Sequence, residues 1–169
     1  MRRGLYIGRF QPFHNGHLAV IEGISQEVDE LIIGIGSADA SHTLTDPFTA
    51  GERVLMITRS LSHLKIPYYV IPIEDVKRNA LWVAHVKSIV PPFDVVYTSN
   101  PLVIQLFREA GCEVKSHPMH ARESLSGTVI RARILENKEI DGFLPQDAVS
   151  VIKEIGGIER MREIAKNDY

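Results

Sequence analysis

The chain has 169 residues, of which 44% are hydrophobic, 24% charged and 7% aromatic, and its formal net charge is −2. This length suits one domain with a continuous core, and the apolar content excludes a disordered chain. Nineteen basic against 21 acidic residues leave no basic excess, so we expect no nucleic-acid partner. An anionic substrate must be held by a local cluster of donors, because the overall charge does not attract it.

The composition also bears on the compartment. Cys112 is the only cysteine, which excludes an intrachain disulfide and fits a reducing cytosol. The first apolar run is interrupted by Arg9, too early for the hydrophobic region of a signal peptide. No stretch approaches the ~20 apolar residues that a membrane span needs. We therefore expect a cytoplasmic protein with no membrane partner.

The first part of the chain alternates β-rich runs with helical patterns. Residues 5–8 predict a strand, and a helical spacing of apolar residues follows from Leu18. Residues 31–36 are almost continuously apolar, which is typical of a strand covered on both faces. A capping box at residues 49–52 then predicts the start of a longer amphipathic helix.

The same alternation continues through the middle of the chain. Three further strands are predicted at residues 68–73, 94–99 and 112–115. A helix over 80–90 lies between the first two of these strands. Asn100 is placed to cap a helix between the last two.

Beyond the fifth predicted strand no β-rich run remains. Helical patterns cover roughly 127–137, 146–155 and 157–167. We therefore predict an α/β fold, a Rossmann-like doubly wound parallel sheet of about five strands with a small helical C-terminal portion. The expected organisation is a nucleotide-binding core over 1–125 and a helical portion over 126–169, within one compact domain.

The segment that leaves the first strand is the most informative part of the sequence. Ligands of open parallel sheets bind beyond the carboxyl ends of the strands, and residues 8–17 (GRFQPFHNGH) lie there. Glycines at both ends let the backbone approach a ligand, and the start of the next helix favours an anion. We expect a phosphate site that uses Gly8, Arg9, His14, Gly16 and His17.

Two other interpretations of the histidine pair remain open at this point. A histidine near a helix start is often only a cap or a solvated side chain. His14 and His17 also resemble half of a zinc site, but such a site needs further ligands, and nothing nearby supplies them. We expect no metal bound by protein side chains alone.

A second segment carries phosphate-binding features. Ser126 is a good N-cap, and Gly127 and Thr128 open a helix whose N–H groups can face a phosphate. Arg131 lies one turn further, and arginine can bind phosphate in bidentate fashion. Taken alone, the segment also fits an ordinary capped surface helix.

Together the two segments resemble one family. Residues 8–17 are similar to the G-x-F-x-P-x-H-x-G-H signature of the nucleotidyltransferase superfamily. Residues 126–131 resemble its second signature, I-S-x-T-x-I-R, with Leu125 at the first position. Within the superfamily the chain is most similar to the archaeal-type nicotinamide-nucleotide adenylyltransferase family. The segments that support this are 36–38, 46–53, 79–83, 92–94 and 100–103. Thr45 departs from the family, which often has a basic residue there.

The resemblance implies that ATP and nicotinamide mononucleotide (NMN) react to give NAD and pyrophosphate. It also implies a homo-oligomer, with a hexamer as the candidate assembly. Mg²⁺ is expected to arrive bound to ATP, because this ion keeps its waters and rarely has an all-protein cage. The implied catalytic residues are His14, His17 and Arg131. The implied ATP-binding residues are Gly8, Arg9, Phe10, Gly16, Asn100, Ser126, Gly127 and Thr128. The implied NMN-binding residues are Asp75, Asn79 and Trp82.

Alternatives to this assignment remain. Trp82 can be either a platform for the nicotinamide ring or a core residue on its helix. The acceptor can instead be that of a related transferase: flavin mononucleotide, phosphopantetheine or a phosphorylated alcohol. A nucleotide sensor without catalysis is a further alternative, which the intact His14, His17 and Arg131 disfavour. The sequence contains no G-x-x-x-x-G-K-[ST] motif, so a P-loop enzyme is excluded.

Overall fold

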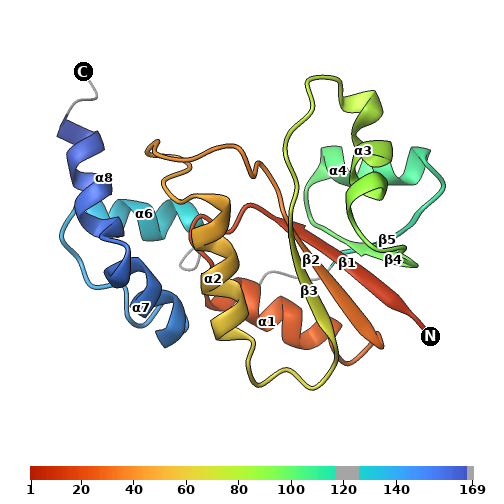
Figure 1. Cartoon of the computed structure of the whole chain (residues 1–169), viewed down its shortest axis with the longest axis horizontal. Helices are drawn as coiled ribbons and strands as arrows, with labels where there is room; N and C mark the ends of the chain where they lie inside the picture. The colour runs from red at the N-terminus through yellow and green to blue at the C-terminus, as the bar shows by residue number, and fades with distance from the viewer. Residues whose placement is uncertain (117–125, 167–169) are drawn as a thin grey trace. The chain divides into compact units, whose positions relative to one another are not determined.

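The computed structural model describes residues 1–116 and 126–166 (Figure 1). Leu125, the first position of the second signature, lies outside them. The strands are β1 (Arg3–Gly8), β2 (Glu30–Ile35), β3 (Tyr68–Pro72), β4 (Val95–Tyr97) and β5 (Glu113–Lys115). The helices are α1 (Asn15–Ile24), α2 (Ala50–Ser60), the 3-10 turn η1 (Asn79–Leu81), α3 (Trp82–Ile89), α4 (Pro101–Glu109), α6 (Gly127–Leu135), α7 (Gln146–Glu154) and α8 (Gly157–Lys166).

The five strands form one sheet in the order β3-β2-β1-β4-β5, and every neighbouring pair is parallel. The order reverses between β1 and β4, which is where open parallel sheets bind their ligands. The predicted fold class, a doubly wound parallel sheet with a helical C-terminal portion, is confirmed.

The chain divides into two compact units with interleaved segments. Unit 1 comprises 1–9, 20–38 and 64–118, and unit 2 comprises 10–19, 39–63 and 119–169. Unit 1 thus holds the sheet, whereas unit 2 holds the histidine segment, α2 and the C-terminal helices. The division at residue 126 expected from the sequence stays a prediction.

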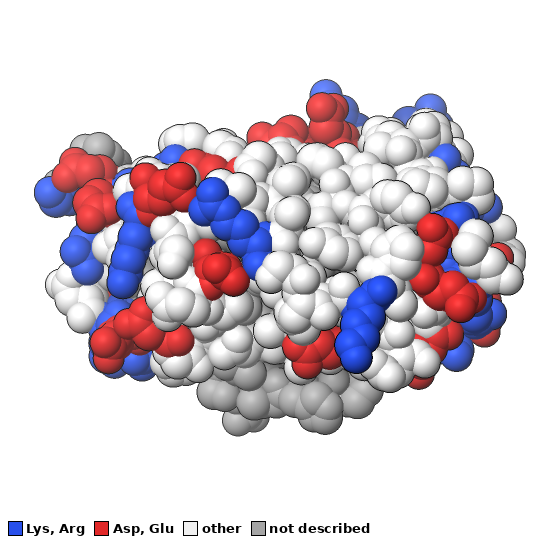
Figure 2. Space-filling model, turned by 60° about the horizontal axis from the view of Figure 1, so that its bottom comes forward, with Lys and Arg blue, Asp and Glu red and all other residues white. Residues whose placement is uncertain are grey.

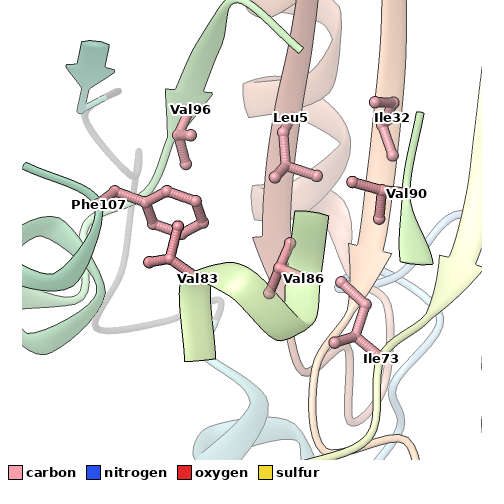
Figure 3. Close-up of a cluster of buried hydrophobic side chains, with 8 residues drawn as sticks. All are labelled: Leu5, Ile32, Ile73, Val83, Val86, Val90, Val96 and Phe107. Carbon is pink, nitrogen blue, oxygen red and sulfur yellow. The ribbon is translucent and has the colours of Figure 1, made fainter. Parts of the chain in front are cut away.

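The core of unit 1 lies between one face of the sheet and α3 and α4. Leu5 of β1 is paired in register with Ile32 of β2 and with Val96 of β4, so the three side chains share a face. Figure 3 shows them pointing toward α3 and toward Phe107 of α4. All four side chains are fully buried, and each such burial stabilises the fold by about 1.5–3 kcal/mol.

Unit 2 is built on the packing of α2, α6, α7 and α8. Helix α2 contacts α7, and α8 contacts both α6 and α7. The predicted capping box is present: Thr49 accepts a hydrogen bond from the Glu52 amide, and the Glu52 side chain accepts one from the Thr49 amide. These bonds satisfy two amides that a helix start otherwise leaves without partners.

The surface carries both signs of charge. The face drawn in Figure 2 shows acidic and basic side chains interspersed, in keeping with the near-neutral composition. Within the described ranges, no helix is long and apolar enough to cross a bilayer.

Candidate active site

The two histidines of the first signature stack on each other at the start of α1. Their ring centroids are 3.6 Å apart, with the planes 21° from parallel. The Nδ1 atom of His14 accepts hydrogen bonds from the amides of Gly16 (3.0 Å) and His17 (3.4 Å). The Nδ1 atom of His17 accepts one from the His14 amide at 3.2 Å. Both rings are therefore oriented by the backbone of their own loop.

These backbone bonds also determine which ring nitrogen carries the proton. An Nδ1 that accepts from an amide is unprotonated, so in each neutral imidazole the proton is on Nε2. Burial lowers the pKa of His14 from 6.5 to about 4. Burial, followed by repulsion from His14, lowers the pKa of His17 well below 6.5. Near neutral pH the pair thus offers two Nε2–H donors and no positive charge.

Two phenylalanines support the His17 ring. The ring of Phe10 meets it edge-on at 4.8 Å between centroids, and Phe13 stacks on it at 5.7 Å. Phe10 is buried and has a φ of 56°, a region in which bulky residues are rare. Such strain is found mainly at sites where the surrounding structure holds it in place.

The second signature forms the start of α6, as predicted. The Ser126 side chain caps the helix by accepting from the Val129 amide at 3.2 Å. One guanidinium nitrogen of Arg131 (Nη2) lies 3.3 Å from the Thr128 hydroxyl, so the side chain reaches back toward the helix start. The other (Nη1) donates to the main-chain oxygen of Gln11 at 2.8 Å. This last bond joins the two signatures within unit 2.

Gly127 has no side chain at the point where Arg131 and the Gln11 main chain come close to α6. A Cβ atom added there would lie 2.8 Å from Nη1 of Arg131 and 3.3 Å from the Gln11 oxygen. The first N–H groups of a helix have no acceptor within the helix, and the dipole there is positive. The start of α6 thus combines backbone donors with a guanidinium held beside them.

Three predicted ATP-binding residues, Gly8, Arg9 and Asn100, belong to unit 1. Gly8 ends β1, and its oxygen accepts from the Gly36 amide at 2.8 Å. Arg9 follows and is exposed. Asn100 caps α4 by accepting from the amides of Leu102 (2.9 Å) and Val103 (3.4 Å). A contact of these residues with ATP stays a prediction.

The predicted NMN-binding residues also belong to unit 1. Asp75 and Asn79 are exposed on the segment that joins β3 to α3, and Trp82 is the first residue of α3. The indole meets Phe107 edge-on at 5.6 Å and packs against the core of unit 1 while staying partly exposed. Trp82 therefore has core contacts as well as an accessible part, and stacking on nicotinamide stays a prediction.

Gln11 links three segments of unit 2, although no sequence pattern assigned it a role. Its side-chain amide is bonded to both the amide and the oxygen of Phe48, and its own main-chain oxygen accepts from Arg131. Gln11 occupies an unspecified position of the first signature, so the motif alone gave no signal.

A protein-built metal site finds no support among the side chains that the structure describes. No group of three or more His, Cys, Asp or Glu residues in 1–116 and 126–166 is arranged to hold an ion. The histidine pair instead directs its Nδ1 atoms to backbone amides, which leaves only Nε2 on each ring for a ligand.

Comparison with known proteins decides the family. The cytidylyltransferase-like family matches residues 5–133. A nicotinamide-nucleotide adenylyltransferase of Methanocorpusculum labreanum is 70% identical over 99% of this chain and 100% of its own length. A protein of the same name from Methanoculleus marisnigri is 61% identical over the same shares. The chain belongs to the nicotinamide-nucleotide adenylyltransferase family.

This adenylyltransferase also shares its fold with solved structures. A bifunctional NMN adenylyltransferase/ADP ribose pyrophosphatase of Francisella tularensis aligns with a TM-score of 0.80 at 20% identity. The alignment covers 99% of this chain and 54% of that one. The family, the nucleotidyltransferase class and the enzymatic nature predicted from the two signatures are therefore confirmed.

Proposed function

We propose that this enzyme moves the AMP group of ATP onto NMN through the cluster formed by His14, His17 and Arg131. A phosphate oxygen of NMN attacks the α-phosphorus of ATP, the bond from that phosphorus to the bridging oxygen breaks, and pyrophosphate leaves. The products are NAD and pyrophosphate. The observation that carries the proposal is the hydrogen bond from Arg131 to the Gln11 oxygen, which joins the two signatures.

In this reaction the histidines act as neutral hydrogen-bond donors. Their Nε2–H groups stabilise the charge that develops on the phosphate oxygens, while Arg131 supplies the positive charge. The NMN phosphate is already ionised near neutral pH, so the attack needs no general base. Catalysis then rests on positioning and charge stabilisation, as in other phosphoryl transfers.

The remaining predicted residues bind the two substrates. To ATP we assign Gly8, Arg9, Phe10, Gly16, Asn100, Ser126, Gly127 and Thr128. Around the nicotinamide end we assign Asp75, Asn79 and Trp82. Thr45 stands where the family often has a basic residue. It is neutral and adds no positive charge to this loop, and its hydroxyl donates to the Asp46 carboxylate at 3.1 Å.

Mg²⁺ is expected to enter with ATP, because this ion keeps several waters and is bound largely through substrate phosphates. A structure of the Francisella tularensis protein, similar in fold with a TM-score of 0.76, is complexed with AMP and a Mn ion. The homo-oligomer implied by the resemblance and the cytoplasmic location expected from the composition stay predictions.

The experiment is a pyrophosphate-release assay with ATP, Mg²⁺ and a panel of acceptors. We expect NMN to be used in preference to flavin mononucleotide, phosphopantetheine and phosphorylated alcohols. His17→Ala removes one preorganised donor and should lower kcat by roughly 10²-fold. Faster release with another acceptor would overturn the substrate assignment, and a folded His17→Ala enzyme with near-normal kcat would overturn the role of the histidine.

A further inference from the structure

Gln11 is a buried polar side chain with an unusually complete set of partners. It is only 3% exposed. Its Nε2 donates to the Phe48 oxygen at 2.9 Å, and its Oε1 accepts from the Phe48 amide at 2.9 Å. Because both atoms of the planar amide are bonded to the same residue, the side chain is fixed in both position and rotation. The side chain thus locks the histidine segment to a residue 37 positions away.

The main chain of Gln11 has a second role. Its oxygen accepts from Nη1 of Arg131 at 2.8 Å, across 120 positions of sequence. A charged donor makes this bond stronger than one between neutral groups. The position of the guanidinium therefore depends on the position of the Gln11 peptide group, which in turn depends on the bonds to Phe48.

Phe48 is itself held from the C-terminal helix. Its ring is fully buried, and a Cβ atom added to Gly157 of α8 would lie 2.9 Å from it. Arg160 of α8 donates to the Pro47 oxygen at 3.0 Å and pairs with both carboxylate oxygens of Glu52 at 2.7 and 2.8 Å. The contact that fixes Gln11 is thus anchored to packed helices rather than to a surface loop.

We propose that Gln11 is a positioning residue: its side chain, clamped to the Phe48 backbone, sets the main-chain oxygen that holds Arg131 in place. Gln11 does not touch the substrates in this scheme and acts only through Arg131. The inference rests on the proposed function, because it assigns the orientation of a guanidinium that the reaction uses.

A double-mutant cycle on the full chain tests the proposal. Gln11→Met keeps the size of the side chain and removes both bonds to Phe48. We expect kcat to fall roughly 10- to 100-fold, because small displacements of catalytic groups have effects of this size. In an Arg131→Ala background the same substitution should lower kcat less than about threefold, because residues that act through one another are not additive. A full effect in that background would overturn the proposal.

Two further variants keep the test decisive. Gln11→Glu retains the acceptor for the Phe48 amide but faces the Phe48 oxygen with a second oxygen, so the buried side chain is pushed away from Phe48 and kcat should fall at least tenfold here too. Val149→Ala, at a buried position of α7, is the matched control: its melting temperature should fall while kcat stays within about twofold.

The outcomes separate this inference from the proposed function. Full activity in Arg131→Ala would overturn the assignment of Arg131 to the reaction itself. Low activity in Arg131→Ala together with wild-type kcat in Gln11→Met and Gln11→Glu would overturn only the positioning role. A loss of kcat in Val149→Ala as large as that in Gln11→Met would mean that general destabilisation explains both.

Discussion

The glycine that opens α6 allows the position of Arg131 to be tested without touching any charged group. In Gly127→Ala the new Cβ atom would lie 2.8 Å from Nη1 of Arg131, well inside a normal carbon–nitrogen contact. The guanidinium is the far end of a flexible side chain, so it is the group that moves. It then gives up its 2.8 Å bond to the Gln11 oxygen.

The expected effect on activity is much larger than the expected effect on stability. Loss of one preorganised donor costs about 3 kcal/mol of transition-state stabilisation, or roughly 10²-fold in kcat. The better helix propensity of alanine is offset by the lost Arg131 bond and by the 3.3 Å approach of the new Cβ atom to the Gln11 oxygen, so the free energy of unfolding should fall by no more than about 1–2 kcal/mol. A variant that stays folded at the assay temperature yet is far slower is not what a general packing defect produces.

Gly51→Ala is the matched control, because it adds the same atom to the first turn of α2. Its Cβ atom would have no other group within 4 Å, so kcat should stay within about twofold of wild type. The measurements are steady-state pyrophosphate release and urea unfolding for both variants. Wild-type kcat in Gly127→Ala would refute the argument that Arg131 must stay on the Gln11 oxygen to function.

Three other predictions concern single side chains. Arg131→Lys keeps the charge but loses the planar fork, so kcat should fall at least tenfold, and an equal rate would show that Arg131 is only a surface charge. The lowered pKa of His14 means that the unfolded chain binds more protons below pH 6.5, so the free energy of unfolding should drop by about 2.5 kcal/mol from this group between pH 7.5 and 4.5. Urea unfolding at both pH values should show a smaller drop for His14→Asn, and an identical drop would contradict the burial argument. Trp82→Ala should weaken NMN binding about 5- to 30-fold in calorimetric titrations while leaving ATP binding nearly unchanged, and parallel loss of both would assign Trp82 to the core alone.

Local signals in the sequence predicted the secondary structure well. The capping box at Thr49 and Glu52 and the Asn100 cap were found because each uses a side chain a few residues from the amide that it satisfies. Apolar runs predicted the inner strands β2 and β4, which are almost entirely buried and leave few polar positions. The edge strand β5 was predicted from a much shorter run, and its Glu113 and Lys115 are exposed. The spacing of apolar residues and the caps both involve residues close together in the sequence, so the helices and strands could be predicted from them.

The contacts that arrange the candidate site were not accessible in the same way. The bonds from Gln11 to Phe48 and to Arg131 span 37 and 120 positions and involve main-chain atoms, which have no residue-specific signal. The stacking of the two histidines was likewise not implied by their spacing, because it depends on which ring nitrogen accepts the loop amides. The motifs identified the candidate site residues, but the hydrogen-bond partners that orient those residues are brought close only by the fold.

The division of charge between the histidines and the arginine has a physical reason. His14 is 1% exposed, and a protonated imidazole there, without a phosphate beside it, would lose most of its hydration. Neutral donors avoid this cost in the empty enzyme and still satisfy phosphate oxygens when they arrive. The positive charge is instead carried by Arg131, which is partly exposed and bonded to a carbonyl oxygen before any substrate binds. A buried cationic cluster would bind phosphate strongly but would destabilise the fold by repulsion and desolvation. This arrangement instead places the charge of Arg131 beside two oriented, neutral donors.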